Sequence, residues 1–158
     1  MLFMLFQLGK NRYALEASRV VEVVPLLALK PFPQSPRGVA GFFVYRGQPV
    51  LALDLCELTL GRPAREQLST RILIVQHHKA TGEKQLIGLI AERATGTLRR
   101  EAKDFVDAGV TLASPPLLGP VLMDDQGVIQ LLDAQKLLDA GDPQLRLTHS
   151  VEAGDATH

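Results

Sequence analysis

The apolar residues of this chain gather in short runs separated by turn-forming residues, a pattern that favours β-strands over helices. It predicts strands at residues 5–9, 12–17, 20–24, 38–47, 48–55, 71–78, 85–93 and 96–100. Residues 121–133 predict a hairpin whose turn runs from Asp124 to Gly127. The pattern predicts one short helix, at residues 133–140, which Gly141 ends.

Prolines mark the main connections between these strands. Pro25, Pro31, Pro33 and Pro36 fall in one segment, and residues 113–120 form a second proline loop. Because proline cannot donate to a sheet ladder, both segments are predicted to be loops or edge pieces. Residues 142–158 lack periodicity and are predicted to form a disordered tail, which leaves residues 1–141 as one domain. Many short strands favour small closed barrels or a sandwich.

Composition narrows the class of protein. The chain has 158 residues, 46% of them hydrophobic, enough for one ordinary domain or two very small ones. The charges of seventeen basic and seventeen acidic residues cancel, so the chain has no net positive charge to attract nucleic acid. Nucleic acid is therefore not expected as a partner. Cys56 is the only cysteine and is predicted to be a small buried apolar residue. No apolar run approaches the roughly 20 residues that span a bilayer, so we expect a cytoplasmic protein without direct membrane insertion.

The sequence offers no credible catalytic or metal site. Neighbouring residues of a strand point to opposite faces, so His77 and His78 cannot hold one metal from the same side. Asp124 and Asp125 precede a glycine in a predicted turn, where aspartate serves the local backbone. Neither a phosphate-binding glycine loop nor a nucleophile elbow is present. We therefore expect no catalytic residues, no metal and no cofactor.

Two charged residues, Glu22 and Arg46, interrupt apolar surroundings. An unpaired charge is costly even when half buried, so each should either pair or face a functional surface. The pattern alone favours an outward polar position on a strand.

Several short motifs follow one another in a recognisable order. They are Phe6-Gln7-Leu8-Gly9, Tyr13-Ala14-Leu15, Val20-Val21-Glu22-Val23, Pro33 to Pro36, Arg46-Gly47, Asp54-Leu55, Arg71 to Val75, Gly88-Leu89-Ile90-Ala91-Glu92, Pro115-Pro116, Gly119, and Leu132 to Leu138. This ordered set resembles the CheW family of chemosensory coupling proteins. Three positions depart from the family pattern: Leu51 replaces a proline, Val44-Tyr45 replaces Asn-Leu, and Glu92 replaces an aspartate.

The resemblance implies an all-β fold of two packed five-stranded β-barrels with a hydrophobic core in each and between them, and a short C-terminal helix. It also implies a non-enzymatic adaptor that joins the cytoplasmic tip of a methyl-accepting chemoreceptor to the regulatory domain of a CheA-type histidine kinase. Such a protein would be cytoplasmic and associated with membrane-attached chemoreceptor arrays.

The resemblance also implies two sets of binding residues. The receptor set is Glu22, Arg46, Gly47, Ile72 and Gly88, and the kinase set is Met4, Ala17 and Val20. We expect Arg46 and Glu22 to form a partly exposed ion pair at the rim of a receptor groove. In an alternating strand, Ser18 and Glu22 would share the face of Val20, which favours a contact residue there, although an ordinary core valine is an equal alternative.

Other functions remain open at the level of the sequence. A CheW-like domain could couple a signalling pathway unrelated to motility, or could compete with a coupler and block assembly. A small β-barrel enzyme or ligand-binding protein is the alternative from a different class.

Overall fold

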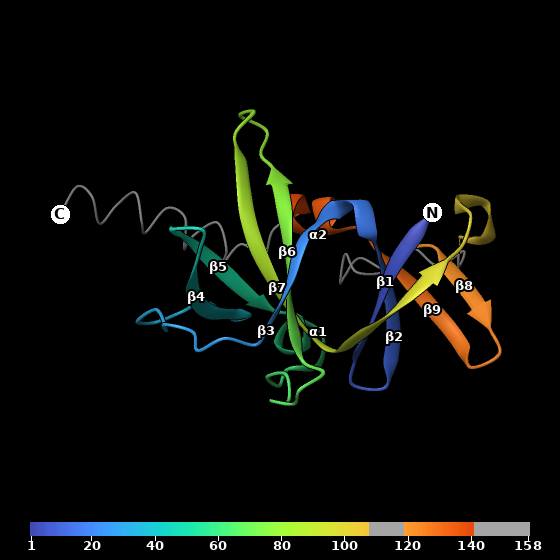
Figure 1. Cartoon of the computed structure of the whole chain (residues 1–158), viewed down its shortest axis with the longest axis horizontal. Helices are drawn as coiled ribbons and strands as arrows, with labels where there is room; N and C mark the ends of the chain where they lie inside the picture. The colour runs from blue at the N-terminus through green and yellow to red at the C-terminus, as the bar shows by residue number, and fades with distance from the viewer. Residues whose placement is uncertain (108–118, 141–158) are drawn as a thin grey trace.

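Nine strands in the described part of the chain form two five-stranded units that share one strand (Figure 1). The computed structural model describes residues 1–107 and 119–140. The terminal unit contains the strands nearest the two chain ends: β1 (Leu2–Leu8), β2 (Asn11–Glu16), β8 (Val121–Asp124) and β9 (Gly127–Leu132). The inner unit contains β3 (Val20–Pro25), β4 (Val39–Tyr45), β5 (Gln48–Asp54) and β6 (Arg71–His78). The predicted all-β class with two five-stranded units is confirmed.

The shared strand is β7 (Lys84–Arg99), which Figure 1 shows passing from one unit into the other. Its first half pairs antiparallel with β6 and parallel with β5, and its second half pairs antiparallel with β1. Gln7 pairs with Glu92 and Leu5 with Gly96, so β7 carries two more residues than β1 in this interval. The sequence predicted two strands here. That was wrong, because the chain passes this bulge without leaving the sheet.

The remaining pairings complete each unit. In the terminal unit β2 pairs antiparallel with β1 and parallel with β9, and β8 pairs with β9. In the inner unit β3 pairs with β6 and β4 with β5. Single bridges, Val106 to Val121 and Lys30 to Phe42, bring connecting segments against β8 and β4.

The apolar core has three parts. The largest cluster spans both units, since it includes Phe6 and Leu15 from the terminal unit and Leu73 and Leu89 from the inner unit. A second cluster fills the inner unit and a third fills the terminal unit. The expected arrangement, a core in each unit and one between them, is confirmed. Cys56 is fully buried in the shared cluster, as predicted.

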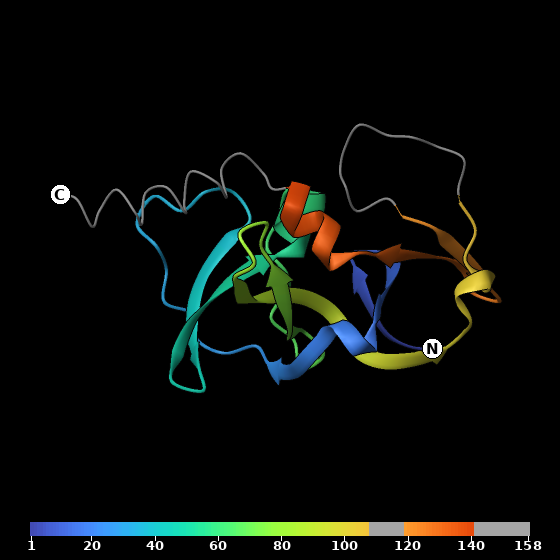
Figure 2. The same cartoon turned by 90° about the horizontal axis from the view of Figure 1, so that it is seen from above.

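Two α-helices lie on one side of the sheets (Figure 2), whereas the sequence predicted only one. The helix that was missed is α1 (Leu55–Leu60). Asp54 caps it by accepting hydrogen bonds from the backbone N–H groups of Cys56 and Glu57 at 2.9 and 3.2 Å. Gly61 ends it in the left-handed conformation that glycine tolerates best.

The predicted C-terminal helix is confirmed as α2 (Ala134–Ala140). Asp133 accepts a hydrogen bond from the backbone N–H of Lys136 at 3.0 Å. The side-chain amide of Gln135 donates to the His78 carbonyl and accepts from the His78 N–H, so it pairs with the end of β6 as a strand residue would. The helix that follows β9 of the terminal unit is thereby fastened to the inner unit. Residues 142–158 and most of the second proline loop lie outside the described residues.

Candidate partner-binding surface

Arg46 and Gly47 form the two-residue turn between β4 and β5. Their φ angles are +50° and +78°, and positive φ at both central residues is what a type I′ hairpin turn requires. A glycine adopts this conformation without strain, whereas an arginine does so only at a cost. An added Cβ at Gly47 would meet nothing within 4 Å, so the turn needs this glycine for its backbone and not for space.

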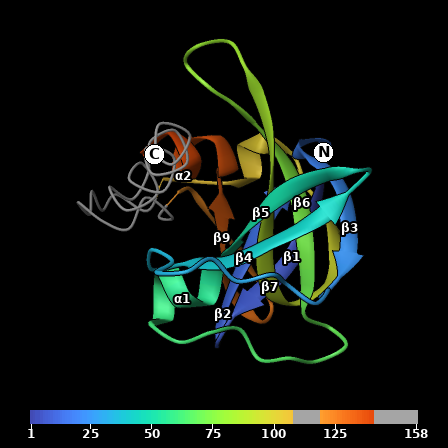
Figure 3. The same cartoon turned by 90° about the vertical axis from the view of Figure 1, so that its left-hand side faces the viewer.

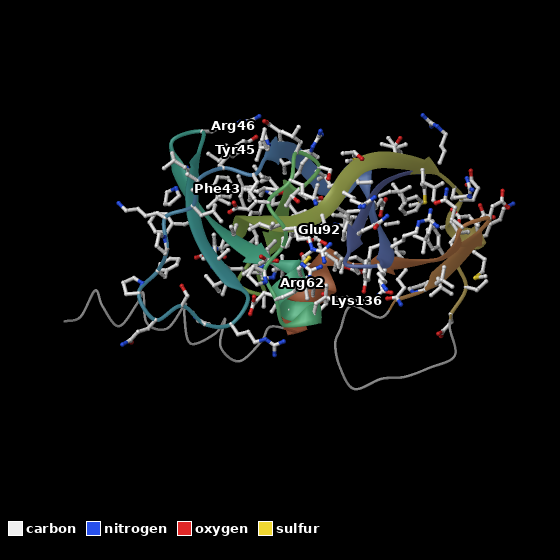
Figure 4. The ribbon with its side chains drawn as sticks, turned by 90° about the horizontal axis from the view of Figure 1, so that it is seen from below. Phe43, Tyr45, Arg46, Arg62, Glu92 and Lys136 are labelled. Carbon is white, nitrogen blue, oxygen red and sulfur yellow. The ribbon has the colours of Figure 1, made fainter. Side chains whose placement is uncertain are left out.

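Three side chains form the Arg46 cluster, which consists of Glu22, Tyr45 and Arg46. The Tyr45 hydroxyl donates to Glu22 Oε1 at 2.6 Å, and Arg46 Nη2 lies 3.4 Å from the same oxygen. The Arg46 guanidinium carbon also lies 4.9 Å from the centre of the Tyr45 ring. The predicted ion pair is confirmed and is partly exposed, with 71% of the Arg46 side chain and 44% of the Glu22 side chain accessible. Figure 4 shows Tyr45 and Arg46 together at the end of the β4–β5 hairpin.

The sequence did not identify Tyr45 as a member of this cluster. Its ring is buried in the inner core while its hydroxyl reaches the surface. The hydrogen bond to the Glu22 carboxylate raises the pKa of Tyr45, because ionisation would break that bond and bring two negative charges together. The neutral tyrosine therefore orients Glu22, and the contact from Arg46 to the same oxygen is the longer of the two.

Ile72 and Gly88, two predicted receptor contacts, lie inside the protein. Ile72 has no exposed surface, and a Cβ added to Gly88 would come within 2.7 Å of Ile72 and 2.9 Å of Phe43. Both positions support the inner core in which the Tyr45 ring is held. Ile72 and the buried backbone of Gly88 therefore cannot contact a partner directly, and any effect on binding would pass through the packing beneath the Arg46 cluster.

The predicted kinase set lies on adjoining elements. Met4 is in β1, Ala17 begins a 3₁₀ turn, η1 (Ala17–Arg19), that contacts β1, and Val20 begins β3. All three are half-buried. Val20 packs against the shared core with part of its side chain, so both roles considered for it, contact and core, remain open.

The expectation that Ser18 and Glu22 share the face of Val20 was wrong. Ser18 belongs to the 3₁₀ turn and not to the strand. The register also shifts between Val20, which pairs with Val75, and Glu22, which pairs with Ile74. This irregularity breaks the alternation and leaves Val21 and Glu22 both exposed.

Strand β3 brings the two sets of residues close to each other. It lies at the outer edge of the inner unit (Figure 3) and, among the described strands, pairs only with β6. Val20 of the kinase set and Glu22 of the receptor set stand two residues apart on it. An unpaired edge and exposed apolar or charged side chains are features of partner-binding strands.

A second ion pair, between Arg62 and Glu92, lies at the junction of the two units (Figure 4). Arg62 donates to both carboxylate oxygens of Glu92, at 3.0 and 3.3 Å, and the backbone N–H groups of Gly9 and Arg65 donate at 3.1 and 2.7 Å. Burial alone would raise the pKa of Glu92, but these four donors outweigh it and lower the pKa to about 2. Glu92 thus joins β7 to the β1–β2 turn and to the loop after α1.

The residues considered for metal or acid–base chemistry have structural contacts. His77 Nε2 lies 3.0 Å from Asp139 Oδ1 and helps to hold α2. Asp124 accepts from the Gln126 backbone N–H, as its turn position predicted, and also forms a bidentate ion pair with Arg12 at 2.7 and 2.8 Å. Among residues 1–107 and 119–140, no three metal-ligating side chains lie close enough together to hold a metal ion. Over the same residues, no helix is long and apolar enough to cross a membrane.

Comparisons with known proteins agree with this architecture. The family model described as "CheW-like domain" matches residues 2–142. The chain is 30% identical to "Protein FrzA" of Myxococcus xanthus over 139 residues, which cover 86% of this chain and 84% of that protein. It is 30% identical to "Chemotaxis protein CheW" of Helicobacter pylori over 112 residues, which cover 70% of this chain and 64% of that protein.

The fold also matches a solved structure. The crystal structure of the scaffolding protein TtCheW from Thermoanaerobacter tengcongensis superimposes with a TM-score of 0.71 and covers 86% of each chain at 20% sequence identity. This match shows the fold, and the family model and the FrzA relative show the family. The chain therefore belongs to the CheW-like domain family, whose members are non-enzymatic scaffold and coupling proteins.

Proposed function

We propose that this protein is an adaptor that couples the cytoplasmic tip of a methyl-accepting chemoreceptor to the regulatory domain of a CheA-type histidine kinase. It acts in the cytoplasm, at membrane-attached chemoreceptor arrays. Family membership supports the coupling role, and the exposed but ordered Arg46 cluster is the observation that carries the assignment of the receptor side.

The receptor side is built on Arg46 and Glu22. Tyr45 holds Glu22 with a short hydrogen bond, while Arg46 makes a longer contact and keeps most of its surface exposed. A guanidinium in this state can bind a carboxylate or carbonyl of a docking helix without first leaving a buried pair. An exposed pair of this kind contributes little stability, at most about 1 kcal/mol, so its value lies in orientation and specificity.

The kinase side is built on Met4, Ala17 and Val20. These half-buried apolar residues come from β1, from η1, which contacts β1, and from the start of β3, which directly follows η1, and we propose that they form one patch. A small apolar patch suits the docking of another β-subdomain. Because this patch adjoins the Arg46 cluster along β3, one protein can hold receptor and kinase close to each other.

The receptor assignment is tested by titrating a receptor hairpin-tip fragment and a kinase regulatory domain separately against Arg46→Ala and Arg46→Lys. Arg46→Ala should weaken receptor binding by roughly 1–3 kcal/mol and leave kinase binding intact. Arg46→Lys should recover only part of the affinity, since lysine keeps the charge but not the planar fork. Arg99→Ala, at an exposed position on β7, is the matched control. Equal losses for both partners would show that Arg46 supports the fold and not the receptor site.

The kinase assignment is tested with Val20→Asp, compared with Val21→Asp at the exposed neighbouring position. Val20→Asp should abolish kinase binding while receptor binding and the amide spectrum stay unchanged. If this variant unfolds, Val20 is a core residue. In that case Ala17→Asp, which changes the same patch from the 3₁₀ turn, decides whether the patch binds the kinase.

A coupler of a signalling pathway other than chemotaxis is the second candidate. The match to Protein FrzA covers a larger share of this chain than the match to the Helicobacter pylori chemotaxis protein, at the same identity. Val44 and Tyr45 beside Arg46 also depart from the family pattern. Affinity measurements against each receptor and kinase of the native organism would separate the two candidates, because the tightest pair identifies the pathway.

A further inference from the structure

A concave pocket of about 460 Å³ lies where the terminal unit meets the loop before β6. It is separate from the Arg46 cluster, and none of the proposed receptor or kinase residues lines it. Its walls come from β1, from the start of β2, from the bulged part of β7, from residues 67 and 69 of the loop, and from the β8–β9 turn.

The lining of this pocket is rich in hydrogen-bond donors and positive charge. It contains the side chains of Arg12, Arg93, Ser69 and Thr95 together with three glutamines, at positions 7, 67 and 126. No aspartate or glutamate lines it. Arg12 is neutralised by its bidentate contact with Asp124, but no hydrogen bond or ion pair joins the side chain of Arg93 to any residue that the structure describes. One positive charge is therefore available to a ligand.

The backbone of Arg93 is held in a strained conformation at this pocket. Its φ is +48°, in the left-handed region, although it stands inside a strand and is not a glycine. Three residues of β7 lie between Glu92 and Gly96 where β1 has only one between Gln7 and Leu5, and the Ala94 N–H donates to the Ser69 carbonyl at 2.9 Å. The bulge thus places Arg93 among the residues that line the pocket. Such bulges and strained residues gather at functional sites.

We propose that this pocket binds a small oxyanion, a phosphate or a carboxylate, with Arg93 as the charged contact. The hydroxyls of Ser69 and Thr95 and the amides of the glutamines would supply neutral donors around it. The charge of Arg93 and the absence of carboxylates from the lining favour an anion over a cation. The site lies apart from the Arg46 cluster, so this proposal is independent of the receptor and kinase assignments.

The test is an amide chemical-shift titration of the whole protein with sodium phosphate and, separately, sodium citrate, both at constant ionic strength against sodium chloride. Saturable shifts are expected at Gln7, Ser69, Thr95 and Gly96, and the phosphate and citrate arms show which oxyanion binds more tightly. Arg93→Gln should weaken binding by about tenfold or more, and Arg93→Lys should weaken it less. Arg99→Gln, on the same strand but outside the pocket, should bind as the unchanged protein does.

Three results would overturn the proposal. One is the absence of saturable shifts at the pocket with either anion, and another is the same affinity in Arg93→Gln as in the unchanged protein. The third is an equal loss in Arg99→Gln, which would indicate general charge attraction. Glutamine, like arginine, has a Cβ, so Arg93→Gln should leave the backbone of the bulge unchanged. The amide spectrum of this variant without ligand checks that the bulge is intact.

Discussion

Glu22 receives two hydrogen bonds of different length on one oxygen, and this difference governs the behaviour of the surface around it. The short bond from the Tyr45 hydroxyl fixes the carboxylate, and the longer one from Arg46 leaves the guanidinium exposed. Because Tyr45 is anchored in the inner core, the direction of Glu22 is set from inside the protein. The titration of Tyr45 therefore reports on its hydrogen bond to Glu22 at this surface.

The first prediction concerns the ionisation of Tyr45. In a Tyr13→Phe background, where Tyr45 is the only tyrosine, near-ultraviolet absorbance should give a pKa above the ordinary value of 10.0. Adding Glu22→Gln should move this pKa down, because the charged acceptor that disfavours ionisation is gone. Glu66→Gln, in an exposed loop, should leave it unchanged. A pKa that does not respond to Glu22→Gln would contradict the hydrogen bond.

The second prediction concerns the buried carboxylate of Glu92. Its pKa falls from 4.5 to about 2 on folding, so the stability that it contributes is complete above pH 4.5 and is lost as the pH falls toward 2. This contribution amounts to at most about 3.5 kcal/mol, at about 1.4 kcal/mol for each pH unit between the two pKa values. Urea unfolding of Glu92→Gln at a series of pH values should show a flatter profile in this window.

The exposed Glu83 provides the control for this measurement. Glu83→Gln should keep the pH dependence of the unchanged protein. If Glu92→Gln loses stability equally at every pH from 2 to 7, the ionisation of Glu92 is not linked to folding.

At the residue scale, sequence reasoning found the charged pair but not its support. Glu22 and Arg46 stood out because each is a charged residue that interrupts an apolar run. Burying an unpaired charge costs free energy, so a charged residue in such a run calls for an explanation. Tyr45 is typical of a strand and gave no such signal, since a hydrogen bond between residues 23 positions apart depends on the pairing of whole strands. Ile72 and Gly88 came from family resemblance alone, which could not tell a buried support from a surface contact.

At the scale of elements, the clearest error of sequence reasoning was α1. The alternating residues of β5 run directly into Leu55 and Cys56, so the apolar pattern continued across the boundary. Asp54 and Gly61, which bracket six residues, were the signal that could have found it. The same Asp54 also accepts a hydrogen bond from the Ala64 N–H at 2.8 Å, so one carboxylate holds the start of α1 and the loop that follows it.

The third prediction follows from this cap. Asp54→Ala should lower the free energy of unfolding by about 1–3 kcal/mol, because three backbone N–H groups lose their acceptor. Asp54→Asn should lower it less, since the amide oxygen still accepts the capping bonds. Glu57→Ala, in the first turn of the same helix, should stay within about 0.5 kcal/mol of the unchanged protein. Equal stability of Asp54→Ala and Glu57→Ala in urea titrations would rule the cap out.

The fourth prediction concerns the bulge in β7. At Arg93, glycine should be more stable than alanine by about 1 kcal/mol, because a Cβ is strained at φ +48°. At Thr97, in the regular part of the same strand, the alanine variant should instead have a free energy of unfolding about 0.5–1 kcal/mol higher than the glycine variant. Urea unfolding of the four variants measures both differences. If alanine were the more stable residue at both positions, the backbone at Arg93 would carry no strain.

At the scale of the whole molecule, β7 makes the two units inseparable. Each needs this strand to complete its sheet, the largest core cluster draws on both, and the Arg62–Glu92 pair and α2 add further connections. Neither unit can lose its order without exposing the shared cluster. We therefore expect the two units to unfold in one cooperative step.

The fifth prediction tests this cooperativity with the two tyrosines as separate probes. Tyr13 lies in the terminal unit and Tyr45 in the inner unit, and the chain has no tryptophan. Tyr45→Phe and Tyr13→Phe each leave one fluorescent reporter. In each variant the urea midpoint from tyrosine fluorescence should equal that from far-ultraviolet circular dichroism. Separate midpoints in either variant would mean that the units unfold independently.

The two-unit architecture itself could not be deduced from periodicity. The short strands and turns predicted an all-β protein, but the parallel pairings of β2 with β9 and of β5 with β7 join distant parts of the chain. No local pattern encodes such pairings. The ordered motifs of the family supplied the two-barrel architecture, and the structure supplies the pairings.

The order of the strands along the chain has a consequence for synthesis on the ribosome. All five strands of the inner unit, β3 to β7, leave the ribosome before β8 and β9 do. The inner unit can therefore pair its strands first. During this time the β1–β2 hairpin lacks β9, so the edge of β2 that pairs with β9 is uncovered. Until β9 arrives, that edge is the place where a nascent chain would meet its neighbours or a chaperone.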